Sequence, residues 1–185
     1  LESDDGIRFS SAEGLANLKP VQAGATVTFG GQTHPADGNA AIIVAEPERA
    51  GALSANRDIR VRLHGFASAR AATAYMPEAP IPAAKQALDA AGTTIERMDA
   101  VKTHNPFAVN DVLFSRQTGY PLEKMNNFGC SLVWGHPQAP MGTRGVIELI
   151  EELAQRGGGY GLFTGCAAGD TAMAVVVEVA DRRKN

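Results

Sequence analysis

The sequence predicts a layered α/β fold in which helices flank a mixed β-sheet. Three observations favour this class: apolar and polar residues alternate in the strand pattern of Ile59–Ser68, strongly periodic helix patterns follow it, and two apolar strands lie close together near the C-terminus. From Asp58 onward the expected order is strand, helix, strand, helix, helix, strand, strand. That order is typical of helices layered on a sheet.

The first 55 residues carry only short, local signals. We expect a helix within residues 10–18 capped by Ser10 or Ser11, a strand over Ala25–Gly30, a buried strand over Ala40–Ala45, and a short helix or connector over Glu46–Ala55. This stretch has no complete alternation of its own. We therefore expect residues 1–55 to be the tail of a domain that begins elsewhere, and residues 56–185 to form the main domain.

The remaining elements follow from hydrophobic periodicity and from helix punctuation. The helix expected within Ile81–Ala91 has Pro82 in its first turn and Gly92 after its end. The further elements are a strand over Met98–His104, a helix over Phe107–Gly119, a small-residue strand or loop over Asn126–Trp134, a strong helix ended by Gly157, and strands over Tyr160–Gly165 and Ala172–Ala180 joined by a turn over Cys166–Asp170.

Composition excludes several classes of function. The chain has 185 residues, 44% hydrophobic and 20% charged, with a formal net charge of -3. It has no arginine-rich stripe, so we expect no nucleic-acid partner. No apolar run approaches the roughly 20 residues that span a bilayer, and no secretory segment opens the chain, so we expect a cytoplasmic protein without a membrane partner. The four histidines and two cysteines lack metal-ligand spacing, so no metal is expected.

The chain begins with Leu1 rather than Met, which indicates a fragment, a processed chain or a chain whose beginning is carried elsewhere. Its two cysteines, Cys130 and Cys166, are interpreted as thiols, because a lone disulfide is unusual in a reducing compartment. No dinucleotide-binding or phosphate-cradling glycine motif is present.

Three polar clusters, expected at three successive strand ends, suggest one site. His136 stands between Gly135 and the stiff Pro137, ahead of the strong helix. His104 and Asn105 end a predicted strand, and Cys166 follows Gly165 at another. Plainer interpretations stay open: a polar turn at His136, a helix cap at Asn105, and a buried, inert thiol at Cys166, as at Cys130.

The motifs GHP and GlyCys, with ATVTFGGQTHPADGNAAIIV, RVRLHGFAS, PIPAAKQALDAAG, NNFGCSLVWGHP and YGLFTGCAAGD around them, resemble the C-terminal part of a thiolase. The resemblance implies a thiolase-like layered fold. Residues 1–55 would be the end of the loop region and the last strand of the N-terminal half, and residues 56–185 the C-terminal domain. It also implies acyl transfer between coenzyme A thioesters, as 3-ketoacyl-CoA thiolysis or Claisen condensation, in fatty acid metabolism.

The resemblance assigns roles to residues. His136 would activate a nucleophilic cysteine and bind the thioester oxygen, and Cys166 would shuttle the α-proton. Three departures from the family pattern concern the pocket: His104-Asn105-Pro106-Phe107 replaces AsnGluAlaPhe, Gln138–Met141 follows GHP in place of small residues, and Thr33 with His34 replaces a serine near pantetheine. His104 would then order a water or donate directly. Phe107 and Arg8 are further candidates for substrate or coenzyme A contacts, and Asn105 and Ala168 for support of the oxyanion.

Neither cysteine matches the family's nucleophile motif, which belongs to the N-terminal half. We therefore expect that half as a partner, on the same or a separate polypeptide, within a homodimer or tetramer. Coenzyme A would be a substrate, with no covalently bound cofactor. Alone, the chain should expose apolar surface. Two alternatives stay open: a noncatalytic thiolase-like subunit that serves structure or substrate handling, and, less favoured, a ketosynthase-like condensing enzyme.

Overall fold

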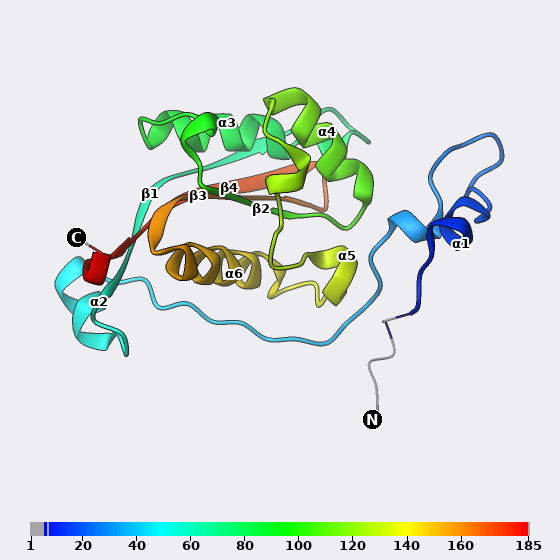
Figure 1. The fold of residues 1–185 in the computed structure, drawn as a ribbon. Helices are drawn as coiled ribbons and strands as arrows, with labels where there is room; N and C mark the ends of the chain where they lie inside the picture. Colours follow the sequence, from blue (N-terminus) through cyan, green and yellow to red (C-terminus); the bar gives the residue numbers. More distant parts are fainter. Residues whose placement is uncertain (1–5, 7, 185) are drawn as a thin grey trace.

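A four-stranded mixed sheet with helices on both faces forms the centre of the protein (Figure 1). The computed structural model describes residue 6 and residues 8–184. The strands are β1 (Ile59–Arg70), β2 (Ala100–His104), β3 (Gly158–Ala167) and β4 (Thr171–Asp181), in the order β1-β4-β3-β2. Strand β2 pairs with β3 in parallel, whereas β4 runs antiparallel to both β3 and β1. The predicted α/β class with a mixed sheet is confirmed.

Helices α3 (Pro80–Ala90) and α4 (Ala108–Thr118) cover one face of the sheet, and α6 (Met141–Arg156) with the single turn α5 (Ser131–Trp134) lies on the other (Figure 1). The buried residues form two clusters, one on each face. The first includes Ala84, Leu88 and Val101, and the second includes Leu149 and Leu153 of α6. The apolar stripes predicted for these helices therefore face the sheet.

The glycines predicted to end two of the helices are also confirmed. Gly92 follows α3 with a φ of 64°, and Gly157 caps α6 with a φ of 92°. Both lie in the left-handed region, where glycine has no steric cost. Short helices α1 (Ala12–Ala16), capped by Ser11, and α2 (Pro47–Leu53) occur where helix signals were found.

Two strand predictions in the N-terminal region are wrong. Residues 25–30 form only an isolated bridge at Thr28 and the start of a 3₁₀ turn, Phe29–Gly31. Residues 40–45 have no regular structure, and the side chains of Ile43 and Val44 are 76% and 72% exposed. A buried strand needs neighbouring strands to satisfy its backbone, and none of the described residues provides one for this segment.

The stretch Asn126–Trp134, for which a strand or a loop was expected, is a loop that ends in the one-turn helix α5. One boundary differs from the sequence prediction. Strand β3 continues through Cys166 to Ala167, so the turn to β4 occupies only Ala168–Asp170. In consequence Cys166 is held by strand hydrogen bonds and not by a loop. Within the described part of the chain, no helix is long and apolar enough to cross a membrane.

Candidate active site

The parallel pairing of β2 with β3 brings two of the three polar clusters together. His104, the last residue of β2, lies opposite Gly165, directly before Cys166. In parallel strands the carboxyl ends meet at the same edge of the sheet, so both side chains reach one crevice. The sheet register thus explains why residues 62 positions apart in the sequence are neighbours.

His136 reaches the same place from the loop between α5 and α6. Gly135 adopts a φ of 83°, and a Cβ atom there would lie 2.8 Å from Nε2 of His34. The backbone N–H of His136 donates to the carbonyl of His34 at 2.7 Å. The His136 and His104 rings are 4.5 Å apart between centroids and meet edge to face at 64°. Glycine is therefore required at position 135 for both its conformation and its close contact.

Residues 32–35, here called the linking segment, connect the clusters. Gln32 forms a bridge with Phe107, and the Thr33 N–H donates to the carbonyl of Pro106 at 2.8 Å. The Thr33 hydroxyl donates to the carbonyl of Ser131. The linking segment thereby fixes both the loop after β2 and the loop that carries His136.

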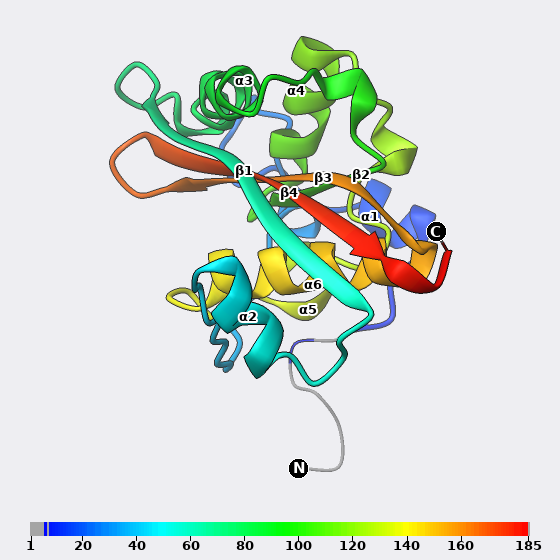
Figure 2. The same cartoon turned by 90° about the vertical axis from the view of Figure 1, so that its left-hand side faces the viewer.

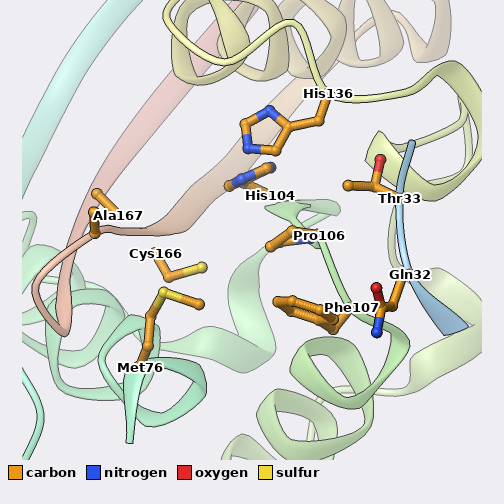
Figure 3. Close-up of a pocket in the computed structure, with 10 residues that line it drawn as sticks. Gln32, Thr33, Met76, His104, Pro106, Phe107, His136, Cys166 and Ala167 are labelled. Carbon is orange, nitrogen blue, oxygen red and sulfur yellow. The ribbon is translucent and has the colours of Figure 1, made fainter. Parts of the chain in front are cut away.

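The three clusters enclose one cavity of about 310 Å³ (Figure 3). Of the predicted site residues, the structure brings His104, His136, Cys166, Thr33, Phe107 and Ala168 into its lining. It places the remaining three outside that lining: the ring of His34 lies against Gly135, Asn105 is fully buried, and Arg8 is exposed to solvent.

The cavity also has lining residues that sequence reasoning missed, namely Gln32, Met76, Pro106 and Ala167. Met76 begins the 3₁₀ turn Met76–Glu78 and points toward Cys166 in Figure 3. No local pattern distinguishes it from a core methionine, because its place in the site depends on tertiary packing. Pro106 could have been found, since it stands inside the motif already singled out.

Burial keeps both histidines neutral. Desolvation, with a smaller contribution from the nearby His136, lowers the pKa of His104 to about 4. Desolvation also lowers the pKa of His136. Nδ1 of His136 accepts the backbone N–H of Gln138 at 3.0 Å. A neutral imidazole has one ring proton, so the proton of His136 is on Nε2.

Cys166 is a buried thiol with one close polar neighbour. Burial raises its pKa, while the Asn110 amide, which donates to Sγ at 3.4 Å, lowers it by a smaller amount. Both cysteines are free, and Cys130 does not line the cavity. Among the described side chains, no cluster of histidine, cysteine or acidic residues could hold a metal ion.

Together the fold and the cavity define a layered α/β domain with two neutral imidazoles and a thiol at one sheet edge. The family described as "Thiolase, C-terminal domain" matches residues 57–179. The chain therefore belongs to the thiolase family.

Two curated relatives align with most of this chain. A "Probable acetyl-CoA acetyltransferase" of Mycobacterium leprae is 34% identical over 94% of this chain and 44% of that protein. A "3-ketoacyl-CoA thiolase" of Pseudoalteromonas atlantica is 36% identical over 96% of this chain and 45% of that protein. The chain thus spans a little under half the length of these relatives.

Solved structures agree with this assignment. The Bacillus anthracis acetyl-CoA acetyltransferase has a TM-score of 0.86 at 27% identity, over 95% of this chain and 45% of that one. Human mitochondrial 3-ketoacyl-CoA thiolase, solved in complex with CoA, has a TM-score of 0.83 at 28% identity, over 96% of this chain and 45% of that one. The thiolase-like layered fold is confirmed.

Proposed function

We propose that this chain supplies the C-terminal half of an active site for acyl transfer between coenzyme A thioesters, by 3-ketoacyl-CoA thiolysis or Claisen condensation. The observation that carries the proposal is the convergence of His104, His136 and Cys166 on one cavity. The names of the similar proteins, acetyl-CoA acetyltransferase and 3-ketoacyl-CoA thiolase, support the same chemistry.

His136 acts as a donor to the thioester oxygen. With Nδ1 occupied by the Gln138 N–H, its Nε2–H is free to donate into the cavity. To accept a proton, Nε2 must be unprotonated, which would place the ring proton on Nδ1 against the Gln138 N–H. The imidazolium formed by accepting the proton would keep the same clash. The geometry therefore supports oxyanion stabilisation better than activation of a cysteine by His136.

Cys166 acts on the α-carbon of the acyl group. A thiol with a raised pKa is protonated at neutral pH and can donate to a carbanion; its thiolate, stabilised by the Asn110 amide, can take the proton back. An enolate formed at this position would have its oxygen near the imidazoles. Proton transfer and oxyanion stabilisation thus occur in the same cavity.

The covalent acyl carrier comes from a second half of the enzyme. Transfer through an acyl-enzyme needs a nucleophile, and neither Cys130 nor Cys166 has the family's nucleophile motif. We assign that nucleophile to an N-terminal half, on the same or a separate polypeptide, with residues 1–55 belonging structurally to it and residues 56–185 forming the C-terminal domain. Thr33 and Phe107 contact the acyl-CoA, with His34 beside them, and Arg8 binds its phosphates. Ala168 supports the oxyanion directly, whereas Asn105, buried behind the lining, supports it through Ser131.

The complete enzyme is a homodimer or tetramer in the cytoplasm, with coenzyme A as substrate. The two free thiols fit a reducing compartment. Native mass spectrometry of the purified protein, followed by denaturation to weigh each chain, tests for the second half.

Kinetics of the assembled protein test the chemistry. With a short 3-ketoacyl-CoA and free CoA, His136→Ala should lower kcat by roughly 100-fold or more, because one oxyanion donor is lost. His64→Ala is the matched control, since His64 bonds to Glu178 on the sheet and lies outside the cavity. It should leave turnover unchanged. Equal turnover for wild type and His136→Ala would instead favour a noncatalytic thiolase-like subunit.

A further inference from the structure

Ser131 lies directly behind the cavity and contacts one of its histidines. It is the first residue of α5 and is fully buried. Its Oγ is 2.8 Å from Nδ1 of His104. It does not line the cavity, so any effect it has on chemistry acts through the imidazole.

A chain of polar contacts fixes Ser131 from the opposite side. Asn105 accepts the backbone N–H of Ser131 through Oδ1 at 3.1 Å and donates its Nδ2 to the carboxylate of Asp111. Since a carboxylate only accepts hydrogen bonds, Asp111 fixes which end of the Asn105 amide faces Ser131. The Thr33 hydroxyl holds the Ser131 carbonyl. The position of the serine is therefore determined before any substrate binds.

The single hydroxyl proton of Ser131 has two neighbouring acceptors. One is Nδ1 of His104 at 2.8 Å, and the other is Sδ of Met141 at 3.4 Å. An imidazole nitrogen is a strong acceptor, whereas a thioether sulfur is a weak one. The proton is therefore best used in the bond to Nδ1.

We propose that Ser131 is a positioning residue that donates to Nδ1 of His104 and so fixes the tautomer with the proton on Nε2. This deepens the proposed function, on which its catalytic meaning rests. His104 would then present Nε2–H toward the cavity, as His136 does. Two such donors can bind one thioester oxygen, directly or through a water.

Nitrogen-15 NMR of histidine side chains tests the tautomer without measuring activity. The protein in its native assembly is labelled with ¹⁵N-histidine, and the His104 signals are assigned by their loss in His104→Gln. We expect Nδ1 of His104 in the unprotonated range and Nε2 in the protonated range at neutral pH. A wild-type spectrum with the proton on Nδ1 would overturn the proposal, and this result needs no Ser131 variant to fold.

Two variants isolate the hydroxyl. In Ser131→Ala the His104 nitrogens should move to values averaged between the two tautomers, because the bond that selects one is gone. In Met141→Leu, the matched control, the His104 signals should stay in place, because the Ser131 hydroxyl donates to Nδ1 of His104 and not to the Met141 sulfur. Unchanged His104 signals in Ser131→Ala, or a change of tautomer in Met141→Leu, would contradict the assignment.

Kinetics separate this inference from the proposed function. In the assembled enzyme Ser131→Ala should lower kcat roughly 10-fold with little change in KM, because a donor is misaligned but not removed. If the wild-type assembly transfers no acyl group, the proposed function fails while the NMR result still decides the tautomer. If it is active and Ser131→Ala keeps the wild-type kcat, the positioning role fails alone.

Discussion

His104 shows how a single buried side chain links chemistry to stability. Its exposed fraction is 8%, and burial together with the adjacent His136 ring opposes its positive charge. The unfolded chain has no such restriction, so its histidine keeps an ordinary pKa near 6.5. The difference between the two pKa values makes the stability of the fold depend on pH.

We expect His104 to destabilise the fold in mild acid. As pH falls from about 6.5 to about 4, the unfolded chain takes up a proton that the folded chain does not, and the wild type should lose about 3 kcal/mol relative to His104→Gln. Above pH 7 the imidazole is neutral in both the folded and the unfolded chain, so this loss is absent and the stability difference no longer varies with pH. Denaturant unfolding of both proteins at several pH values measures the difference. A difference in unfolding free energy between the two proteins that does not change with pH would contradict the buried, neutral imidazole.

Cys166 should be a slow nucleophile toward alkylating reagents at neutral pH. Only the thiolate reacts, and burial raises the pKa of Cys166. Its iodoacetamide reaction, followed by peptide mass spectrometry, should accelerate only above the pKa of an ordinary thiol. Asn110→Leu should raise that pKa further by removing the amide donor, with Cys130 in the same chain as a reference for general opening. An apparent pKa below that of a free thiol would contradict the assignment.

At the residue scale the sequence predicted the side chains that carry the chemistry better than the side chains that hold them in place. His136, Cys166 and His104 stand in recognisable motifs, and the structure brings all three to one cavity. Ser131, Asn110 and Met76 have no such signal, because their contacts come from sheet register and loop packing. A serine within FGCSLVW cannot be told from any small residue at a helix start.

At the scale of elements, α6 can pack closely on β3 because Gly145 has no side chain where the Phe163 ring lies. A Cβ atom on Gly145 would meet the Phe163 ring at 2.3 Å, whereas one on Gly142 would meet it no closer than 4.0 Å. Gly145→Ala should therefore destabilise the fold by about 1–3 kcal/mol, despite the better helix propensity of alanine. Gly142→Ala should stabilise it by about 0.5 kcal/mol. Chemical denaturation measures both, and equal effects would refute the close packing.

A buried ion pair joins β2 to the same helix. Lys102, fully buried, contacts Glu148 and the carbonyl of Gly129, and Glu148 also accepts Arg144 at 2.7 Å. Glu148→Gln would leave the lysine charge buried without its counter-ion and should cost about 3 kcal/mol.

Lys102→Met is the partner experiment. It leaves Glu148 paired with Arg144, and should cost only about 1 kcal/mol for the lost hydrogen bond. Unfolding free energies measured at neutral pH show which of the two substitutions costs more stability. A larger cost for Lys102→Met than for Glu148→Gln would mean that the lysine is not held as a charged, paired group.

The long helices and strands after Ile59 were predictable where the sequence carries a clear hydrophobic period and a proline or glycine at the helix ends. The patterns of α3 and α6 indicate both the helix and its buried face. The strands expected over residues 25–30 and 40–45 were wrong for the opposite reason. Their apolar composition indicates burial, but burial depends on a neighbour that the described residues do not supply.

At the scale of the whole molecule, apolar surface concentrates in the N-terminal region and on β1. Strand β1 lies at the edge of the sheet (Figure 2). The extended segment before α2 passes below α6 in the view of Figure 1. Large exposed side chains there include Phe29, Ile43, Val44, Leu63 and Phe66. The expectation of exposed apolar surface is confirmed. Three consecutive apolar residues, Ile42, Ile43 and Val44, are 40%, 76% and 72% exposed, which favours an interaction site along this segment.

If the proposed N-terminal half covers this surface, charge placed on it should weaken assembly without unfolding the chain. Ile43 and Val44 are mostly exposed, so Ile43→Asp with Val44→Asp removes little buried contact and should change the unfolding free energy by less than about 0.5 kcal/mol. The same change places two carboxylates in the proposed interface, where desolvating an unpaired charge is costly. Native mass spectrometry should show loss of the assembly.

Leu122→Asp is the control for that experiment, because Leu122 is also an exposed apolar residue but lies at the 3₁₀ turn after α4, away from the N-terminal segment. It should leave the assembly intact. Hydrogen exchange should then show protection of residues 40–45 in wild type and in Leu122→Asp, but not in the double variant. Because a strand forms only where a neighbour pairs with it, protection of these amides would mean that the strand expected from the sequence forms on assembly. Exchange equally fast with and without the partner would instead mean that this segment stays outside the interface.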